Sequence, residues 1–124
     1  MGDFQKLHVW NMAKDLAVQV YKVISENDQL KRDFRFSSQL TSSAVSISSN
    51  IAEGDELKTV KHGISHFYIA KGSTAELMTQ LIIAKEIGVI ESAKADKLIM
   101  KTNQISAALY KLIEARKSWN TKNN

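Results

Sequence analysis

Hydrophobic residues recur at steps of three and four along four stretches of the chain, with polar residues between them. This spacing places the hydrophobic side chains on one side of an α-helix. The third stretch has the most regular pattern, and the fourth places one charged residue, Arg116, on its apolar side. We therefore expect four helices, over residues 3–27, 33–53, 59–88 and 92–119.

Local signals predict where these helices begin and end. Asp3 and Thr59 are candidate N-caps, because their side-chain oxygens can accept hydrogen bonds from the first free backbone N–H groups of a helix. Gly54 and Gly88 lie where a left-handed residue is expected after the second and third helices.

Long helices with short connections favour antiparallel neighbours. The chain has no proline and five glycines, which argues against a β-sandwich or a barrel. We predict an all-α fold: one up-down-up-down antiparallel four-helix bundle over residues 1–119, followed by a disordered polar tail over 120–124.

Several kinds of chemistry are not supported by the sequence. The absence of cysteine excludes disulfides, cysteine zinc sites and thiol nucleophiles. No glutamate is followed three residues later by histidine, as a di-metal bundle requires. His62 and His66 have metal-ligand spacing, but Gly63 stands where a zinc hydrolase needs glutamate, and a third ligand is missing. We therefore expect no catalytic residues, metal, cofactor or small-molecule substrate.

The charge balance makes a nucleic-acid partner more probable than average. Seventeen lysines and arginines against thirteen acids give a net charge of +4 and a pI near 9.3. With no signal peptide and no long apolar run, we expect a cytoplasmic protein that does not bind membranes. The candidate nucleic-acid contacts form two groups, and the sequence leaves open whether these share one end of the bundle: Lys31, Arg32 and Arg35, and Lys111, Arg116 and Lys117.

A second candidate site lies where the second and third helices meet. Polar residues are unusual at the end of a buried helix, and a carboxylate there opposes the helix dipole. We expect a structural polar cluster of Asn50, Glu53, Ser73 and Glu76; the alternative is a catalytic pair of carboxylates. Close packing is the expected reason for Gly72 inside the third helix, because glycine there costs about 1 kcal/mol relative to alanine.

The second helix is unusually rich in serine. Seven serines and Thr41 lie between Ser37 and Ser49, and residues 36–52 carry no charge. Two interpretations remain open: a helix packed tightly on several sides, or a surface that packs on another subunit.

The chain resembles the 23S rRNA intervening-sequence protein family of bacterial four-helix bundles. The resemblance rests on the Asn-Ile-Ala-Glu-Gly string at 50–54, on Gly72-Ser73 followed by Glu76-Leu77, and on the apolar positions from Phe4 to Gly88. It implies ring-like homo-oligomers, often pentamers. A related branch, the accessory proteins of diversity-generating retroelements, uses a basic surface to bind nucleic acid and a reverse transcriptase. Where many members carry adjacent arginines, this chain has residues 41–43, Thr-Ser-Ser, which removes phosphate contacts from the second helix.

Two functions follow from these observations. The first is a non-enzymatic oligomer that binds RNA or DNA through a basic surface. The alternative is a protein-interaction or scaffolding module that does not bind nucleic acid. They differ in whether affinity for nucleic acid exists and falls with salt.

Overall fold

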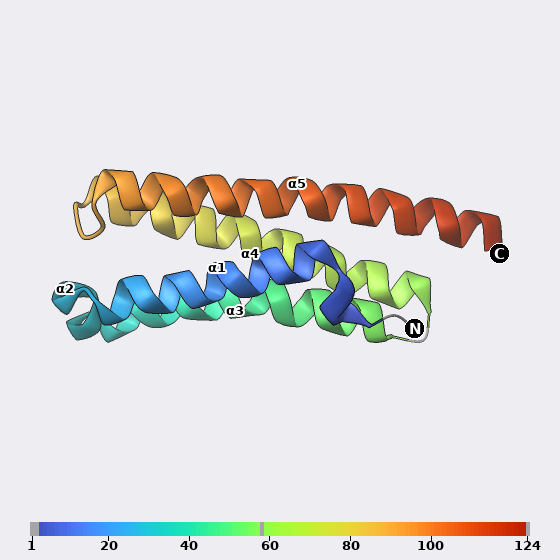
Figure 1. Cartoon of the computed structure of the whole chain (residues 1–124), viewed down its shortest axis with the longest axis horizontal. Helices are drawn as coiled ribbons and strands as arrows, with labels where there is room; N and C mark the ends of the chain where they lie inside the picture. The colour runs from blue at the N-terminus through green and yellow to red at the C-terminus, as the bar shows by residue number, and fades with distance from the viewer. Residues whose placement is uncertain (1–2, 58, 124) are drawn as a thin grey trace.

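The computed structural model describes residues 3–57 and 59–123, and this part of the chain contains helices and no strands. An all-helical protein was predicted, and this prediction is confirmed. Four long helices, α1, α3, α4 and α5, are joined by short connections, one of which contains the short helix α2 (Figure 1). The elements are η1 (Phe4–Lys6), α1 (His8–Ser25), α2 (Asp28–Arg32), α3 (Phe34–Glu56), α4 (Val60–Glu86) and α5 (Ser92–Asn123).

Side chains cap the starts of α2, α3 and α4. The side chains of Asn27, Asp33 and Thr59 accept backbone N–H bonds at the starts of α2, α3 and α4. The cap predicted at Thr59 is therefore confirmed. Asp3 instead caps the 3-10 turn η1, because extended Leu7 separates that turn from α1.

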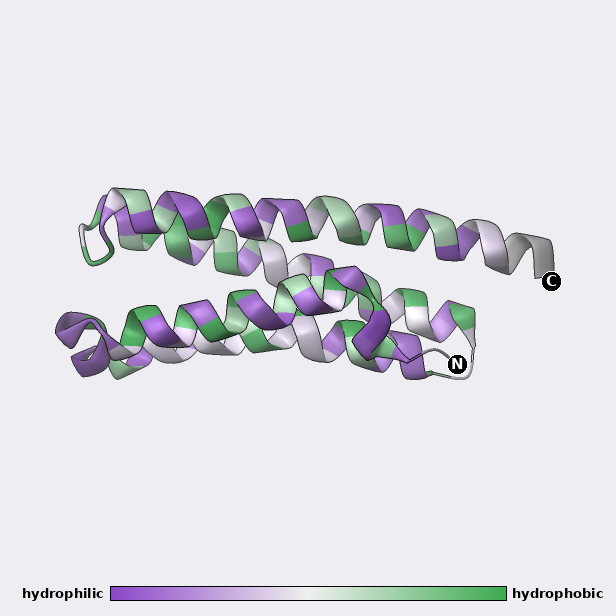
Figure 2. Ribbon diagram, viewed as in Figure 1, coloured by the Kyte–Doolittle hydropathy of each residue, from purple (hydrophilic) through white to green (hydrophobic). Residues whose placement is uncertain are grey.

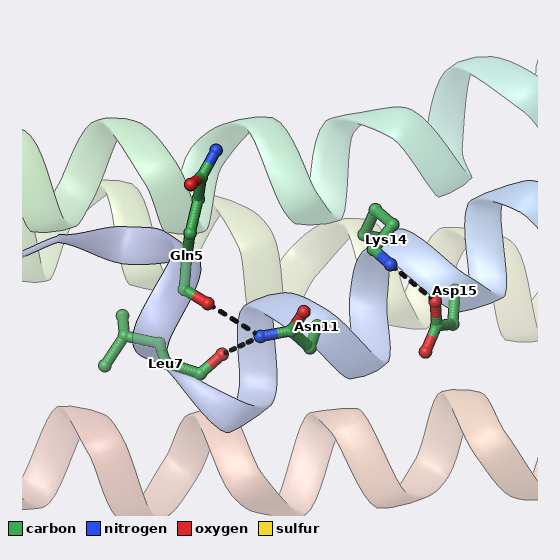
Figure 3. Close-up of polar contacts among 5 residues, drawn as sticks. All are labelled: Gln5, Leu7, Asn11, Lys14 and Asp15. Carbon is green, nitrogen blue, oxygen red and sulfur yellow. Dashed lines mark hydrogen bonds and ion pairs between the residues drawn. The ribbon is translucent and has the colours of Figure 1, made fainter.

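The turn η1 is held to α1 by one amide group. The Asn11 side chain donates hydrogen bonds to the carbonyl oxygens of Gln5, at 2.9 Å, and Leu7, at 3.1 Å (Figure 3). The aromatic ring of Phe4 also packs edge-on against Trp10, with 5.1 Å between ring centroids. The first turn of the chain thus folds back onto α1.

The two predicted helix-ending glycines have different roles. Gly88 has a φ of 80°, and the N–H groups of Gly88 and Val89 bond to the carbonyls of Lys85 and Ala84, which is the Schellman pattern that ends α4. Gly54 does not end its helix, because α3 continues to Glu56.

Gly54 instead marks the closest approach of two helices. A Cβ atom at this position would lie 2.5 Å from the Phe67 ring and 2.8 Å from the Gly63 carbonyl oxygen. Gly54 is therefore required by packing between α3 and α4, a role that only the folded chain reveals.

The long helices surround one hydrophobic core. In the described chain α1 and α4 each pack on α3 and on α5, while the backbones of the diagonal pairs α1–α4 and α3–α5 do not approach each other closely. Figure 1 shows α1 and α5 in front of α3 and α4. Figure 2 shows hydrophobic and hydrophilic residues alternating along these helices, as one-sided burial requires. The largest fully buried side chains include Leu16, Leu40, Ile47, Ile51, Phe67, Leu77, Leu81, Ile105, Leu109 and Ile113.

Polar contacts fix the relative direction of neighbouring helices. From Ser46 to Asn50 along α3, the partners on α4 change from Ser73 back to His66, so these two helices run antiparallel. The α4–α5 pair is also antiparallel, because Lys71 contacts Ser106 whereas Lys85, later on α4, contacts Asp96, earlier on α5. No helix in the described part of the chain is long and apolar enough to cross a membrane.

The serine-rich helix α3 shows features of both predicted arrangements, tight packing inside the bundle and a surface that could pack on another subunit. Ser37 and Ser43 are buried, whereas Ser42 and Ser49 are exposed. The Thr41 hydroxyl donates a hydrogen bond to the Ser37 carbonyl one turn earlier, as hydroxyls inside helices often do. Part of this helix therefore packs tightly inside the bundle, while its outer side remains open to solvent.

The last helix is longer than the hydrophobic pattern predicts. An end near Trp119 was expected, with a disordered tail over 120–124, but α5 continues to Asn123. Its final turns project beyond the start of α4 in Figure 1. Residue 124 lies outside the described residues, as do the side chains of 120–123.

Candidate functional site

Three of the four residues of the predicted polar cluster lie along the α3–α4 contact. The hydroxyls of Ser46 and Ser73 are 2.9 Å apart, and the Asn50 amide donates to the Ser46 carbonyl at 2.9 Å and to its hydroxyl at 3.1 Å. Glu53 joins the same chain of contacts through His66. Because each bond links neighbouring turns or the two helices, the cluster fixes how α3 and α4 are aligned.

His66 connects the two ends of this cluster. Its Nδ1 lies 3.1 Å from Asn50 Oδ1 and 3.1 Å from Glu53 Oε2. Both oxygens can only accept, so Nδ1 carries the proton and donates. His62, four residues earlier, is held separately by Thr59, whose hydroxyl lies 2.9 Å from His62 Nδ1. Among the described residues no group of three or more histidines, cysteines or acids is arranged to hold a metal.

Glu76 lies outside this cluster. It lines a separate open groove of about 510 Å³ between α3 and α4. Because the helices are antiparallel, moving from Ser73 to Glu76 along α4 shifts the opposite position on α3 from Ser46 to Ser42, away from Glu53. Glu53 and Glu76, the pair of the catalytic alternative, therefore lie in different places: Glu53 beside His66 and Glu76 in the separate groove. The groove is lined by Ser38, Gln39, Ser42, Ser43, Glu76 and Gln80.

A buried ion pair, which we did not predict, joins α3 to α5. Arg116 Nη2 donates to Asp55 Oδ1 at 2.8 Å, and the Asp55 side chain is 3% exposed. The guanidinium carbon also lies 5.3 Å from the centre of the Phe67 ring. Arg116 was expected to contact nucleic acid, but its charge is paired inside the bundle. Its position on the apolar side of the last helix was the sequence signal for this role.

The remaining basic candidates lie at opposite ends of the bundle, a point that the sequence left open. Helix α2, which carries Lys31 and Arg32, and the start of α3, with Arg35, lie at one end in Figure 1. Lys111 and Lys117 lie on the second half of α5, toward the other end. All five side chains are exposed, but in one protomer they do not form a continuous surface.

Two of these lysines have partners within the chain. Lys31 forms an exposed ion pair with Asp28 at 3.5 Å. Lys117 pairs with Glu114 at 3.5 Å and lies over the Tyr68 ring, 5.3 Å from its centre. A side-chain hydrogen bond with Tyr68 is the main cause that raises the pKa of Lys117 above its ordinary value. Arg32, Arg35 and Lys111 form no ion pair with the described residues.

The outer face of α4 is largely uncharged and exposes three isoleucines and a tyrosine to solvent. We define the α4 face as the exposed positions between 65 and 83, which carry a single charged residue, Glu76: Ser65, Tyr68, Ile69, Gly72, Ala75, Glu76, Thr79, Ile82 and Ile83. A Cβ atom added to Gly72 would meet nothing within 4 Å, so the expectation that packing inside the chain explains this glycine is wrong. Sequence reasoning missed this face because it followed the apolar positions at steps of three and four, which form the buried side of the helix.

A second exposed apolar patch lies on the opposite side of the bundle. We define the α1–α3 face by Val18 and Tyr21 of α1 and Val45 of α3, which are 45%, 55% and 39% exposed. An open groove of about 430 Å³ between α1 and α3 contains Val18 and Tyr21. Because α1 and α4 occupy diagonal corners, this patch and the α4 face are directed away from each other.

Comparisons with known proteins agree with this architecture. A crystal structure of a protein with unknown function from the S23 ribosomal protein family of Bacteroides thetaiotaomicron matches with a TM-score of 0.80 and 20% identity. The match covers 85% of this chain and 97% of that one, so the fold is shared. No curated protein gives a significant match. The sequence profile of the 23S rRNA-intervening sequence proteins matches residues 5–111. The chain therefore belongs to the 23S rRNA-intervening sequence protein family.

Proposed function

We propose that this chain is a non-catalytic assembly module, an up-down-up-down four-helix bundle that associates with copies of itself into a closed ring. The observation that carries this proposal is the α4 face, an exposed and largely apolar surface about five helical turns long. Contiguous apolar surface of this kind on a soluble protein marks an interaction site.

Gly72 points to a helix as the partner of this face. Glycine inside a helix costs about 1 kcal/mol relative to alanine, and nothing within the protomer requires it here. A missing side chain lets a second helix approach closely. Ala75 and Thr79 continue the same exposed side with small residues, and the larger isoleucines lie at its ends.

The position of the second patch favours a ring over a symmetric pair. An isologous dimer uses the same surface on both copies, whereas a head-to-tail contact uses two different surfaces and can close into a ring. The α4 face and the α1–α3 face are both apolar and lie on opposite sides, as a head-to-tail contact needs. Five copies is the ring size that the family resemblance implies.

A non-catalytic role is supported by how the reactive side chains are used. His66 is committed to Asn50 and Glu53, and His62 to Thr59. Glu53 and Glu76 do not face a common space. The two histidines and Glu53 are engaged in alignment or capping and Glu76 lies apart from them, which leaves no pair arranged for acid–base chemistry among these groups.

Two single variants and their mixture test the ring. Ile69→Lys places a charge on the α4 face and Val18→Lys places one on the α1–α3 face; both positions are about half exposed, so each protomer should still fold. The matched control is Met100→Lys, because Met100 is an exposed residue of α5 that lies outside both faces. The molar mass of each protein in solution would be measured by light scattering coupled to size-exclusion chromatography.

The ring predicts that wild type and Met100→Lys are oligomers and that each face variant alone is monomeric. A mixture of the two variants should give a dimer, because one intact copy of each face remains. A Val18→Lys protein that dimerises by itself would indicate an isologous α4 contact instead. A monomeric wild type at all accessible concentrations would refute the proposal.

Binding of RNA or DNA is the second candidate function. Arg32 and Arg35 are exposed at one end and unpaired within the described chain, and a ring would repeat them around one rim. Five protomers would together carry about +20, enough for strong salt-dependent attraction to phosphates.

Fluorescence anisotropy with structured RNA and duplex DNA across a salt series tests this candidate. Arg32→Glu combined with Arg35→Glu should weaken binding and flatten its salt dependence. Lys6→Glu with Lys61→Glu changes net charge equally at exposed sites elsewhere and should bind nearly as wild type. Absence of binding at low salt would leave the assembly module without a nucleic-acid role.

A further inference from the structure

A groove follows the line where α1 and α5 meet, and we call it the α1–α5 groove. These two helices pack less extensively than the other three neighbouring pairs of long helices. Two adjoining hollows of about 190 and 230 Å³ lie along the line, and both are bordered by Gln19 and Lys101. Figure 1 shows both helices on the near side of the bundle, so this groove opens away from α3 and α4.

Lysines surround one half of the groove. Lys22 of α1 and Lys94, Lys97 and Lys101 of α5 line the larger hollow, and Glu26 is the only acid among its lining residues. The Lys101 ammonium donates to Gln19 Oε1 at 2.8 Å, which holds its positive charge at the seam without a carboxylate. The other three lysines form no ion pair with the described residues. The larger hollow therefore has an excess of positive charge that the chain itself does not neutralise, while Asp15, which borders the smaller hollow, is paired with Lys14.

The floor of this groove is apolar. Half-buried Met12 and Val23 present apolar surface to the groove. Beneath them, the core side chains of Leu16, Leu98 and Ile105 close the bottom of the hollows and are at most 4% exposed. The stretch that lines the groove from Met12 of α1 to Glu26, the residue after α1, is about 21 Å long at 1.5 Å per residue, or about four helical turns.

We propose that the α1–α5 groove binds an acidic amphipathic helix of a partner protein. The apolar face of such a helix would lie on the floor, and its carboxylates would reach Lys94 and Lys97 on the α5 side. This arrangement is the helix-in-groove mode of recognition, with charge setting the choice of partner. Lys22 also lines the groove beside the α1–α3 face, but Lys94, Lys97 and Lys101 lie on α5, outside the α4 and α1–α3 faces, so the proposed binding does not require ring formation.

The lining favours a peptide over nucleic acid. Sequence-tolerant binding of single strands uses aromatic side chains on which bases stack, and the groove is lined by none. A phosphate backbone would also place charge over the apolar floor without covering it. An amphipathic helix satisfies the floor and the lysines together.

Three labelled peptides of about four helical turns test the proposal. They share one leucine face and differ only in the polar face, which carries glutamate, glutamine or lysine. Full-length protein would be titrated by anisotropy at two salt concentrations, with an oligothymidylate and a structured RNA as further probes. The variants are Lys94→Glu with Lys97→Glu, and the charge-matched control Lys6→Glu with Lys61→Glu.

The groove predicts that the glutamate peptide binds most tightly, that salt weakens its binding, and that the groove variant loses affinity by about tenfold or more. The control variant should stay within about twofold of wild type. On addition of the glutamate peptide, the backbone amide NMR chemical shifts of residues in α1 and α5 should change, whereas those in α4 should not.

Equal binding of all three peptides, or an equal loss in the control variant, would overturn the proposal. Tighter binding of the oligothymidylate or the RNA, lost in the groove variant, would overturn it as well, because the lysines would then form a nucleic-acid surface.

Discussion

Two short ion pairs in this protein differ mainly in burial, which makes them a test of how burial changes the energy of a charge pair. Arg116 and Asp55 are 2.8 Å apart, and the Asp55 side chain is 3% exposed. Lys85 and Asp96 are 2.7 Å apart, with side chains 37% and 58% exposed. Removing the cation from each pair by substitution therefore compares the loss of unfolding free energy in a buried and in an exposed ion pair.

The structure predicts unequal costs. Arg116→Ala leaves a buried carboxylate without its partner, which costs about 3–5 kcal/mol of unfolding free energy. Loss of the guanidinium from the face of Phe67 adds about 0.5–2 kcal/mol. Lys85→Ala should cost at most about 1 kcal/mol, because water already screens that pair. Asp55→Ala should cost less than Arg116→Ala, since the arginine left behind is 23% exposed and can reach water.

Urea denaturation followed by circular dichroism measures these differences. All variants must be compared at one protein concentration, because self-association would shift apparent stability. Replacing both members of the buried pair by apolar residues, as in Asp55→Leu with Arg116→Met, should recover most of the loss. Equal costs for Arg116→Ala and Lys85→Ala would refute the reasoning, because burial would then not determine the energy of the pair.

Two further predictions concern the two glycines Gly72 and Gly54 and the tautomer of His66. Gly72→Ala should raise protomer stability by about 1 kcal/mol in urea denaturation, because the position is helical and open. Gly54→Ala should instead lower stability by about 1–3 kcal/mol, because its methyl group would lie 2.5 Å from the Phe67 ring; a gain at both glycines would contradict the packing described. Nitrogen NMR should find neutral His66 protonated on Nδ1, and Asn50→Ala should reduce that tautomer, whereas an Nε2 proton in the wild type would contradict the assigned hydrogen bonds.

Much of the fold is readable from the sequence because its determinants are local. The apolar spacing of three and four predicts the long helices, and side-chain caps such as Thr59 act within one turn. Gly88 was predicted correctly for the same reason: a Schellman ending depends only on neighbouring residues. The short helix α2 escaped prediction because its five residues are too few for a periodic pattern.

The candidate site depended on contacts between distant residues. Asn50, Glu53 and Ser73 were predicted together, but Glu76 was assigned to them although the antiparallel alignment places it beside another groove. Arg116 was predicted to contact nucleic acid, yet it pairs with a residue 61 positions earlier.

The sequence by itself determined that the chain forms amphipathic helices, where most of them begin, and that cysteine chemistry is absent. The tertiary structure alone decided what each outward side does. It gave Gly54 a packing role, left Gly72 exposed, separated the basic residues to two ends, and brought the lysines of α1 and α5 around one groove. The physical reason is that helix periodicity states which residues share a face, whereas the neighbour of that face is fixed only when the helices pack.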